Sequence, residues 1–282
     1  MQFKIPTASV YVPDGTPVAE ALARTTHMGI SAHQDDIEIM AMEGVVDSFG
    51  RTDKWFTGVI VTNGAGSARD DMYANYTDEE MQKIRRLEQK KAAFVGEYGA
   101  QAFLDFPSSA VKDPAATGPI EDLTALLLAA QPEIVYTHNL ADKHPTHIGV
   151  AMKVLAAIRA LPMDKRPKSF LGCEVWRDLD WMIDADKHVM RLDAHENIQV
   201  ALVSVFDSQV VGGKRYDLAT MGRRRAHATY HESHAVDASH LLNFAMDLTP
   251  LIKDDTLSPM DHVMAHVNRF AGEVKTNLAK FA

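Results

Sequence analysis

The sequence predicts a doubly wound α/β fold, in which a mostly parallel sheet carries helices on both faces. Three observations lead to this fold class. Short apolar runs alternate with helical patterns four times in the first half of the chain. Two of these runs stop abruptly at polar clusters, as buried parallel strands do where they deliver functional groups. Finally, 46% of the 282 residues are hydrophobic, which is enough for one large core.

The first half of the chain supplies the repeating strand–helix units. Apolar and β-branched runs predict strands at residues 28–32, 55–62, 102–106 and 133–138. Apolar stripes at helical spacing predict helices at residues 36–49, 77–98, 119–130 and 145–160. The second of these helices opens on Thr77-Asp-Glu-Glu80, a capping-box pattern. The lengths fit βαβ units and therefore a parallel sheet.

The second half and the two ends are less regular. Residues 170–176 and 188–192 are predicted antiparallel edge strands, and helices are predicted at 194–210, 216–227 and 259–280. Residues 1–27 are interpreted as an N-terminal extension packed outside the sheet, with a helix at 17–24, and residues 235–282 as a C-terminal helical extension. No repeat, low-complexity tract or long linker divides the chain, so we expect residues 1–282 to form a single domain.

The amino-acid composition indicates which binding partners and which cellular compartment to expect. The formal net charge of −9 disfavours binding to a nucleic-acid backbone. The single cysteine, Cys173, excludes an intrachain disulfide and points to a reducing compartment. No signal-peptide core is present at the N-terminus, and no window approaches the ~18 apolar residues of a membrane span. We therefore expect a cytoplasmic protein that does not bind a membrane, and the sequence leaves open whether it forms a homo-oligomer.

Two polar clusters follow two of the predicted strands. One contains His33, Asp35 and Asp36, and the other contains Asp142, His144 and His147. Strand ends near the switch point of a doubly wound sheet meet over one crevice, so the two clusters are expected to converge. Each cluster alone has a plain alternative explanation, since adjacent acids also suit the start of a helix. Together they favour a metal site.

The residue types suggest how such a site would work. Hydrolytic zinc takes three protein ligands and leaves a position for water, and His33, Asp36 and His147 supply them. Asp35, which must point elsewhere, is predicted to be the general base. A protonated His144 is predicted to stabilise the oxyanion and to protonate the leaving amine, with Asp142 orienting the His144 ring. Another divalent metal is the alternative to zinc.

Both clusters resemble a known family. Ala32-His-Gln-Asp-Asp-Ile-Glu38 resembles the Ala-His-Pro-Asp-Asp-x-Glu signature of the PIG-L/LmbE-like zinc deacetylases, and Asp142-Lys-His-Pro-Thr-His147 is similar to their Asp-x-His-x-x-His motif. The resemblance implies a Rossmann-like fold and the same residue roles. It also implies that Arg85, within Ile84-Arg-Arg-Leu-Glu88, helps to hold the substrate. Gln34 replaces the usual proline, and Thr146 replaces a common acid.

The resulting hypothesis is a zinc-dependent N-deacetylase that acts on an N-acetylglucosamine-like sugar or conjugate. Its partner would be that small N-acetylated substrate. Two rivals remain open at this point. One is a metal-dependent hydrolase of another bond, such as an ester or phosphoester. The other is a non-catalytic protein that binds a sugar or metabolite on the same fold.

Overall fold

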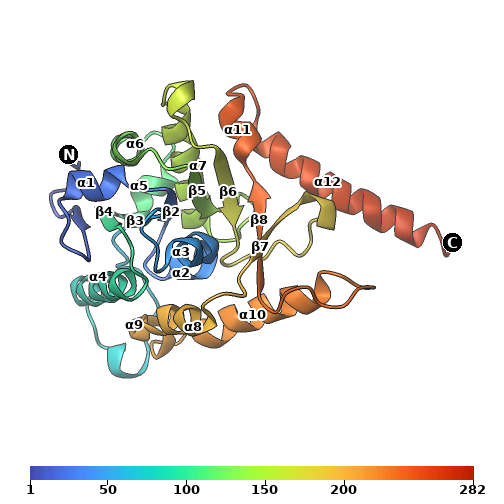
Figure 1. Cartoon of the computed structure of the whole chain (residues 1–282), viewed down its shortest axis with the longest axis horizontal. Helices are drawn as coiled ribbons and strands as arrows, with labels where there is room; N and C mark the ends of the chain where they lie inside the picture. The colour runs from blue at the N-terminus through green and yellow to red at the C-terminus, as the bar shows by residue number, and fades with distance from the viewer.

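The computed structural model describes all residues from Met1 to Ala282, and its eight strands form one sheet (Figure 1). The spatial order of the strands is β1-β4-β3-β2-β5-β6-β8-β7. Their bounds are β1 Ser9–Tyr11, β2 His27–Ser31, β3 Phe56–Thr62, β4 Ala100–Phe106, β5 Ile134–His138, β6 Ser169–Cys173, β7 Lys187–Arg191 and β8 Leu242–Asp247. The run from β4 to β6 is parallel throughout, which confirms the predicted mostly parallel sheet.

Helices cover both faces of the sheet, and each face has its own apolar core. One core contains side chains of α1 (Val18–Ala23), α6 (Gly118–Ala130), α7 (Pro145–Arg159) and α11 (Thr249–Lys253). The other contains side chains of α2 (Asp36–Met40), α3 (Met42–Ser48), α4 (Asp78–Val95), α8 (Glu196–Ser204) and α10 (Tyr216–Tyr230). This confirms a sheet between two helical layers, as Figure 1 shows.

The remaining helices lie at the margins of these layers. They are α5 (Ser108–Lys112), α9 (Asp207–Val210), α12 (Pro259–Leu278) and the 3₁₀ turns Asp71–Tyr73, Met163–Lys165 and Asp184–Asp186. Two predicted helices are interrupted. The one expected at 36–49 becomes α2 and α3 because Ala41 leaves the helical conformation at φ −106° and ψ 24°. The one expected at 194–210 becomes α8 and α9. No helix combines the length and apolar character that crossing a membrane requires.

The switch point of the sheet lies between β2 and β5. From β2 the chain builds outward through β3 and β4, and then returns to add β5 and β6 on the other side. His27 pairs with Phe56 of β3 and with Ile134 of β5, so β2 is hydrogen-bonded on both edges. The carboxyl ends of β2 and β5 are therefore neighbours, at the place where such sheets form a ligand crevice.

Both chain ends contribute to the sheet, although residues 1–27 were predicted to lie outside it and residues 235–282 to be helical. Strand β1 pairs antiparallel with β4, with Ser9 opposite Phe103, so residues 1–27 supply an edge strand. Strand β8 lies between β6 and β7 and is antiparallel to both, so residues 235–282 are not purely helical. Strand β6 is an interior strand parallel to β5, not an antiparallel edge. The three residues of β1 are too few to show a period.

Candidate metal centre

The turn that follows β2 is held by its two neighbouring strands, β3 and β5. The Ala32 carbonyl accepts from the Thr62 backbone amide at 3.0 Å and from its hydroxyl at 2.8 Å. The Ala32 amide donates to His138 Nε2 at 2.8 Å. Asp35 has a left-handed φ of 98°, a conformation that costs energy for a residue with a side chain. This strained turn allows α2 to begin at Asp36, directly beneath the strand end.

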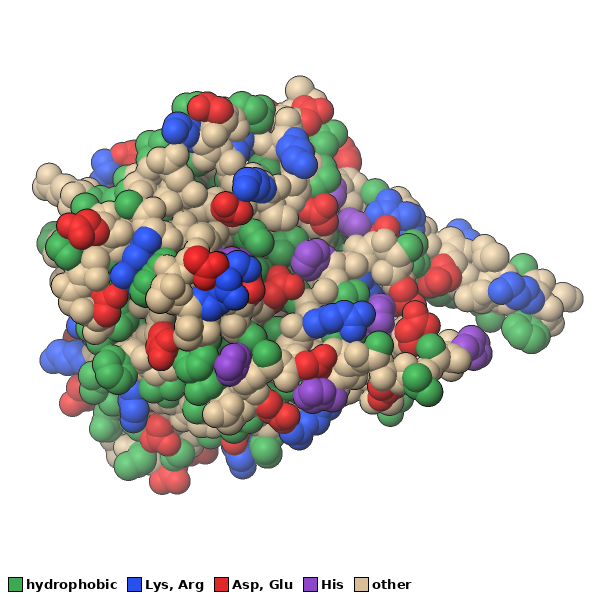
Figure 2. All heavy atoms as spheres, in the orientation of Figure 1, with side chains coloured by type: hydrophobic (Ala, Val, Ile, Leu, Met, Phe, Trp, Pro, Cys, Tyr) green, Lys and Arg blue, Asp and Glu red, His purple; other side chains and the backbone are tan.

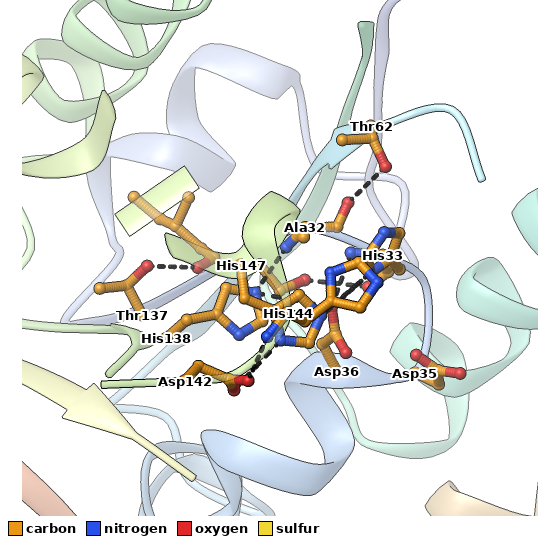
Figure 3. Close-up of polar contacts among 12 residues, drawn as sticks. Ala32, His33, Asp35, Asp36, Thr62, Thr137, His138, Asp142, His144 and His147 are labelled. Carbon is orange, nitrogen blue, oxygen red and sulfur yellow. Dashed lines mark hydrogen bonds and ion pairs between the residues drawn. The ribbon is translucent and has the colours of Figure 1, made fainter. Parts of the chain in front are cut away.

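Three donor atoms from the two clusters lie close together. His33 Nδ1 is 3.2 Å from Asp36 Oδ2 and 3.2 Å from His147 Nε2, and the last two atoms are 3.4 Å apart (Figure 3). For zinc–ligand bonds of about 2.0–2.1 Å, the edge of a tetrahedron is about 3.4 Å. The three atoms thus have the spacing of three corners of a zinc tetrahedron, and no rearrangement of the backbone is needed.

His147 is oriented by a carboxylate on its far side. Its Nδ1 lies 3.3 Å from Asp142 Oδ2, and both side chains are fully buried. Burial would raise the pKa of Asp142, but hydrogen bonding and charge from His147 outweigh it and lower that pKa. An ionised Asp142 therefore accepts from Nδ1–H and leaves the Nε2 lone pair of His147 free to face His33 and Asp36.

The expected contact between Asp142 and the His144 ring is absent. Asp142 Oδ1 accepts the His144 backbone amide at 3.0 Å, while the ring Nδ1 of His144 is buried without a partner. Burial, helped by the neighbouring His147 and His33, lowers the pKa of His144 to about 4. Asp142 therefore contacts the His144 backbone and not its ring, and burial disfavours the protonated form of His144 that the prediction invoked. The residue lines the pocket as a neutral imidazole.

His138 lies beside the cluster but is not available as a ligand. The side chains of Asp36, His138 and His147 are close enough to be considered for a metal, and so are those of His33, His144 and His147. However, His138 Nε2 already accepts the Ala32 amide, so its lone pair is occupied. Burial lowers the pKa of His138 well below its usual range, which keeps the ring neutral. The ring instead stacks on His147 with centroids 3.9 Å apart.

Asp35 lies apart from the three donors and pairs with Arg85. Figure 3 shows its carboxylate directed away from Asp36. Arg85 Nη2 is 3.3 Å from Asp35 Oδ2 and 2.5 Å from the Gln34 carbonyl oxygen. Burial raises the pKa of Asp35, and the Arg85 guanidinium opposes that shift. Arg85 reaches the pocket as predicted, but the contacts seen in the structure are to the motif itself.

His33, Asp35, Asp36 and His144 line an open pocket of about 400 Å³. Its walls come from the glycine-rich loop after β3, from α5, and from the segments before α7 and α10. Gly64, at φ 74°, lies against Gln34: a Cβ there would be 2.4 Å from Gln34 Oε1, so the loop closes over the turn only because this residue is glycine.

Several wall residues were not identified from the sequence. Lys112, Lys214 and Tyr216 line the pocket together with Trp176, whose ring lies 6.3 Å from that of His144. Lys112 ends the short helix α5, Lys214 lies between α9 and α10, and Tyr216 is the first residue of α10. At such positions no periodic pattern indicates which side chains face inward.

Comparison with known protein families gives a match that includes both polar clusters. The family model described as "PIG-L: GlcNAc-PI de-N-acetylase" matches residues 28–158, a span that contains both polar clusters. No protein with a curated description matches the chain.

Three solved structures share the fold. A conserved protein, TT1542, from Thermus thermophilus has a TM-score of 0.60 and 16% identity, over 83% of this chain and 99% of its own. N,N'-diacetylchitobiose deacetylase from Pyrococcus horikoshii has a TM-score of 0.61 and 14% identity, over 82% and 86%. GalB, the 4-carboxy-2-hydroxymuconate hydratase of Pseudomonas putida, has a TM-score of 0.59 and 14% identity, over 79% and 96%. At these identities the similarity concerns the fold alone.

Proposed function

Because residues 28–158 match the PIG-L family model, we propose that the chain is a zinc-dependent N-deacetylase of an N-acetylglucosamine-like sugar or conjugate. One observation carries the proposal: His33 Nδ1, Asp36 Oδ2 and His147 Nε2 lie 3.2–3.4 Å from one another, and His33 and Asp36 line an open pocket. The fold alone does not choose the reaction, since a hydratase shares it.

The donor set fits a hydrolytic zinc ion. Two imidazole nitrogens and one carboxylate oxygen are ligands that zinc accepts, and three protein ligands leave one position open towards the pocket. When bound, the metal supplies a Lewis acid that activates water and polarises an amide carbonyl. Asp142 supports this role because it fixes the tautomer of His147.

The chain's own residues account for the proton transfers. Asp35 lines the pocket next to the ligands without belonging to them, so its carboxylate can accept the proton of the attacking water. Arg85 Nη2 contacts Asp35 Oδ2 and holds that carboxylate in place. His144, neutral at physiological pH, offers an N–H to the developing oxyanion. Since His144 carries no extra proton, Asp35 is the better source of the proton for the leaving amine.

Elemental analysis combined with an amine-release assay tests this function. Purified protein is expected to hold about one zinc ion per chain and to release acetate and free amine from N-acetylglucosamine compounds. The substrate panel also contains acetyl esters and phosphoesters, because turnover of these alone would support the rival hydrolase. Ligand binding by the zinc-loaded protein without any turnover would support the non-catalytic rival.

Two matched variants distinguish loss of the general base from a general loss of stability. Asp35→Asn is expected to keep the metal and to lose about 100- to 10,000-fold in kcat. The control is Asp122→Asn, which alters a buried carboxylate on α6 whose partner is the Lys4 backbone amide. Comparable activity in Asp35→Asn and in this control would reject Asp35 as the base.

A further inference from the structure

Helix α12 stands away from the rest of the molecule. Figure 1 shows it leaving the sheet with the C-terminus at its far end, and Figure 2 shows a spur with hydrophobic side chains near its tip. Its polar and aromatic contacts with the rest of the molecule end at Phe270. His266 Nδ1 and Arg269 Nε contact Asp186 Oδ2 at 3.1 and 2.5 Å, and Phe270 packs on Trp181 with ring centroids 6.5 Å apart.

A row of apolar side chains runs along this helix without a partner. The exposed members are Met260 at 74%, Met264 at 46%, Val274 at 40%, Leu278 at 66% and Phe281, just past the helix, at 90%. Val267 and Ala271 lie between them and are partly buried. We call these seven residues the α12 seam. Large apolar side chains exposed in one continuous row usually mark an interaction surface.

The spacing of the α12 seam indicates the kind of partner. Its members follow one another at intervals of four, three, four, three, four and three residues. This alternation is the a/d repeat of a coiled coil, in which a second helix of the same kind covers the seam. A membrane surface is less well matched. Interfacial helices carry mainly Lys and Arg on the polar face, whereas α12 mixes Asp261 and Glu273 with its basic residues.

We propose that a second copy of this chain covers the α12 seam, with the two α12 helices antiparallel about a twofold axis. In this arrangement Met264 packs on Val274 of the partner subunit, and Ala271 packs on Val267 of the partner subunit. Each pair occurs twice because the interface is isologous. The two molecular bodies then lie towards opposite ends of the helix pair, since the polar and aromatic contacts of each α12 with its own body end at Phe270.

Charge favours the antiparallel direction over the parallel one. Asp261 and Lys275 occupy the same position in successive repeats, directly after Met260 and Val274. Antiparallel packing places Asp261 beside Lys275 of the partner subunit at both ends of the interface. In a parallel pair this position faces Val263, Phe270 and Asn277 of the other helix, so no ion pair would form.

An apolar pocket at the start of α12 provides a place for the chain end. This cavity of about 470 Å³ lies between α7 and α12, and most of its lining is hydrophobic: Leu140, Ile148, Met152, Met260, Val263 and Met264. In the antiparallel register, Leu278 of the partner subunit lies opposite Met260, and Phe281 of the partner subunit lies next to the pocket. The two most exposed ends of the α12 seam would therefore cover each other.

Solution mass and matched variants test the proposal. At about 50 µM, light scattering should give twice the 31.1 kDa of one chain. Leu278→Glu combined with Phe281→Glu should give a monomer with an unchanged circular dichroism spectrum, because both side chains are exposed. The control Leu87→Glu changes an exposed leucine of α4 and should leave the dimer intact. A monomeric wild-type chain, or binding to anionic lipid vesicles that these two substitutions abolish, would overturn the proposal.

Two further variants test the direction of the helices. Asp261→Lys should weaken the dimer, and adding Lys275→Asp should restore it. In a Cys173→Ser background, Asn268→Cys should form a disulfide-linked dimer on oxidation, since residue 268 lies at the twofold axis. Asn277→Cys should not, because the two copies would be about 24 Å apart along the helices. Cross-linking of Asn277→Cys but not of Asn268→Cys would exclude the antiparallel pair. None of these measurements depends on the metal centre.

Discussion

Asp142 Oδ2 lies 3.3 Å from Nδ1 of His147, on the side of the ring opposite to the candidate metal position. The same oxygen accepts the Trp176 backbone amide at 3.2 Å, and Oδ1 accepts the His144 backbone amide, so the carboxylate is fixed by three donors. The imidazole is therefore held both in its tautomer and in its orientation. A carboxylate in this position raises the basicity of the metal-binding nitrogen.

Asp142→Asn is expected to weaken metal binding about 10- to 100-fold, because the amide cannot stabilise the same tautomer as strongly. Competition with a fluorescent zinc chelator measures the change. Asp122→Asn serves as the control, since that buried carboxylate is remote from the cluster. An unchanged zinc affinity in Asp142→Asn would show that His147 does not need this partner.

His138→Phe distinguishes between two candidate ligand sets. If His138 acts only as acceptor for the Ala32 amide, the variant should still bind one zinc ion. It should also lose about 1–3 kcal/mol of stability, because a buried amide is left without a partner. Urea unfolding and elemental analysis measure the two effects. His147→Ala, by contrast, should lose the metal. Loss of metal in His138→Phe at retained fold would assign His138 to the ligand set.

The parts of the site that could be predicted from the sequence are those set by strand ends. His33 and His147 come together because β2 and β5 are neighbours at the switch point, and alternating strands and helices predict that arrangement. The contact between Asp142 and His147 could not be predicted in this way. An Asp-x-His-x-x-His motif at a helix start allows the carboxylate to reach either ring, and the choice depends on how β5 meets α7.

The fold also has features that depend on contacts between distant residues and could not be predicted from local sequence. Strand β8 enters the sheet between β6 and β7 although it follows β7 by some fifty residues, and no local pattern specifies such a pairing. The break at Ala41 also has a distant cause. Gly44 packs so closely on the sheet that a Cβ there would be 2.7 Å from the Tyr136 ring, which fixes α3 independently of α2.

Glu38 should make stability depend on pH. Its Oε1 accepts from Gln89 Nε2 and Tyr98 Oη, both at 2.8 Å, but Oε2 is buried without a partner. Burial raises the pKa of Glu38 from 4.5 to about 7. The folded state therefore binds a proton that the unfolded state has released. The resulting stability is complete below pH 4.5 and is lost as the pH rises through about 7.

Glu38→Gln, which resembles the protonated form, should remove this dependence. Compared with the variant, wild type should lose about 2.5 kcal/mol between pH 5 and pH 8.5, because the pKa of Glu38 is raised from 4.5 to about 7 in the folded state. Urea unfolding at both pH values measures the difference. Glu79→Gln, a change of an exposed carboxylate on α4, should follow wild type. Parallel pH profiles for wild type and Glu38→Gln would contradict the assignment.

Lys112 and Lys214 should make the pocket prefer acidic substrates. Both line it and neither pairs with a carboxylate, and the Lys214 ammonium lies 4.9 Å from the centre of the Trp176 ring. The chain as a whole is negatively charged, but these two ammonium groups make the pocket locally positive. The pocket therefore attracts anions. Each change to Gln should raise KM for N-acetylglucosamine 1-phosphate about two- to fivefold. The KM for N-acetylglucosamine should stay constant.

The control for these lysines is Lys168→Gln, which alters an exposed lysine that pairs with Glu133 and should change neither KM value. Because exposed charges are screened, added salt should reduce the difference between the two substrates in wild type but not in the double variant of Lys112 and Lys214. Equal changes in KM for both substrates would mean that the lysines affect the shape of the pocket but do not attract the phosphate group.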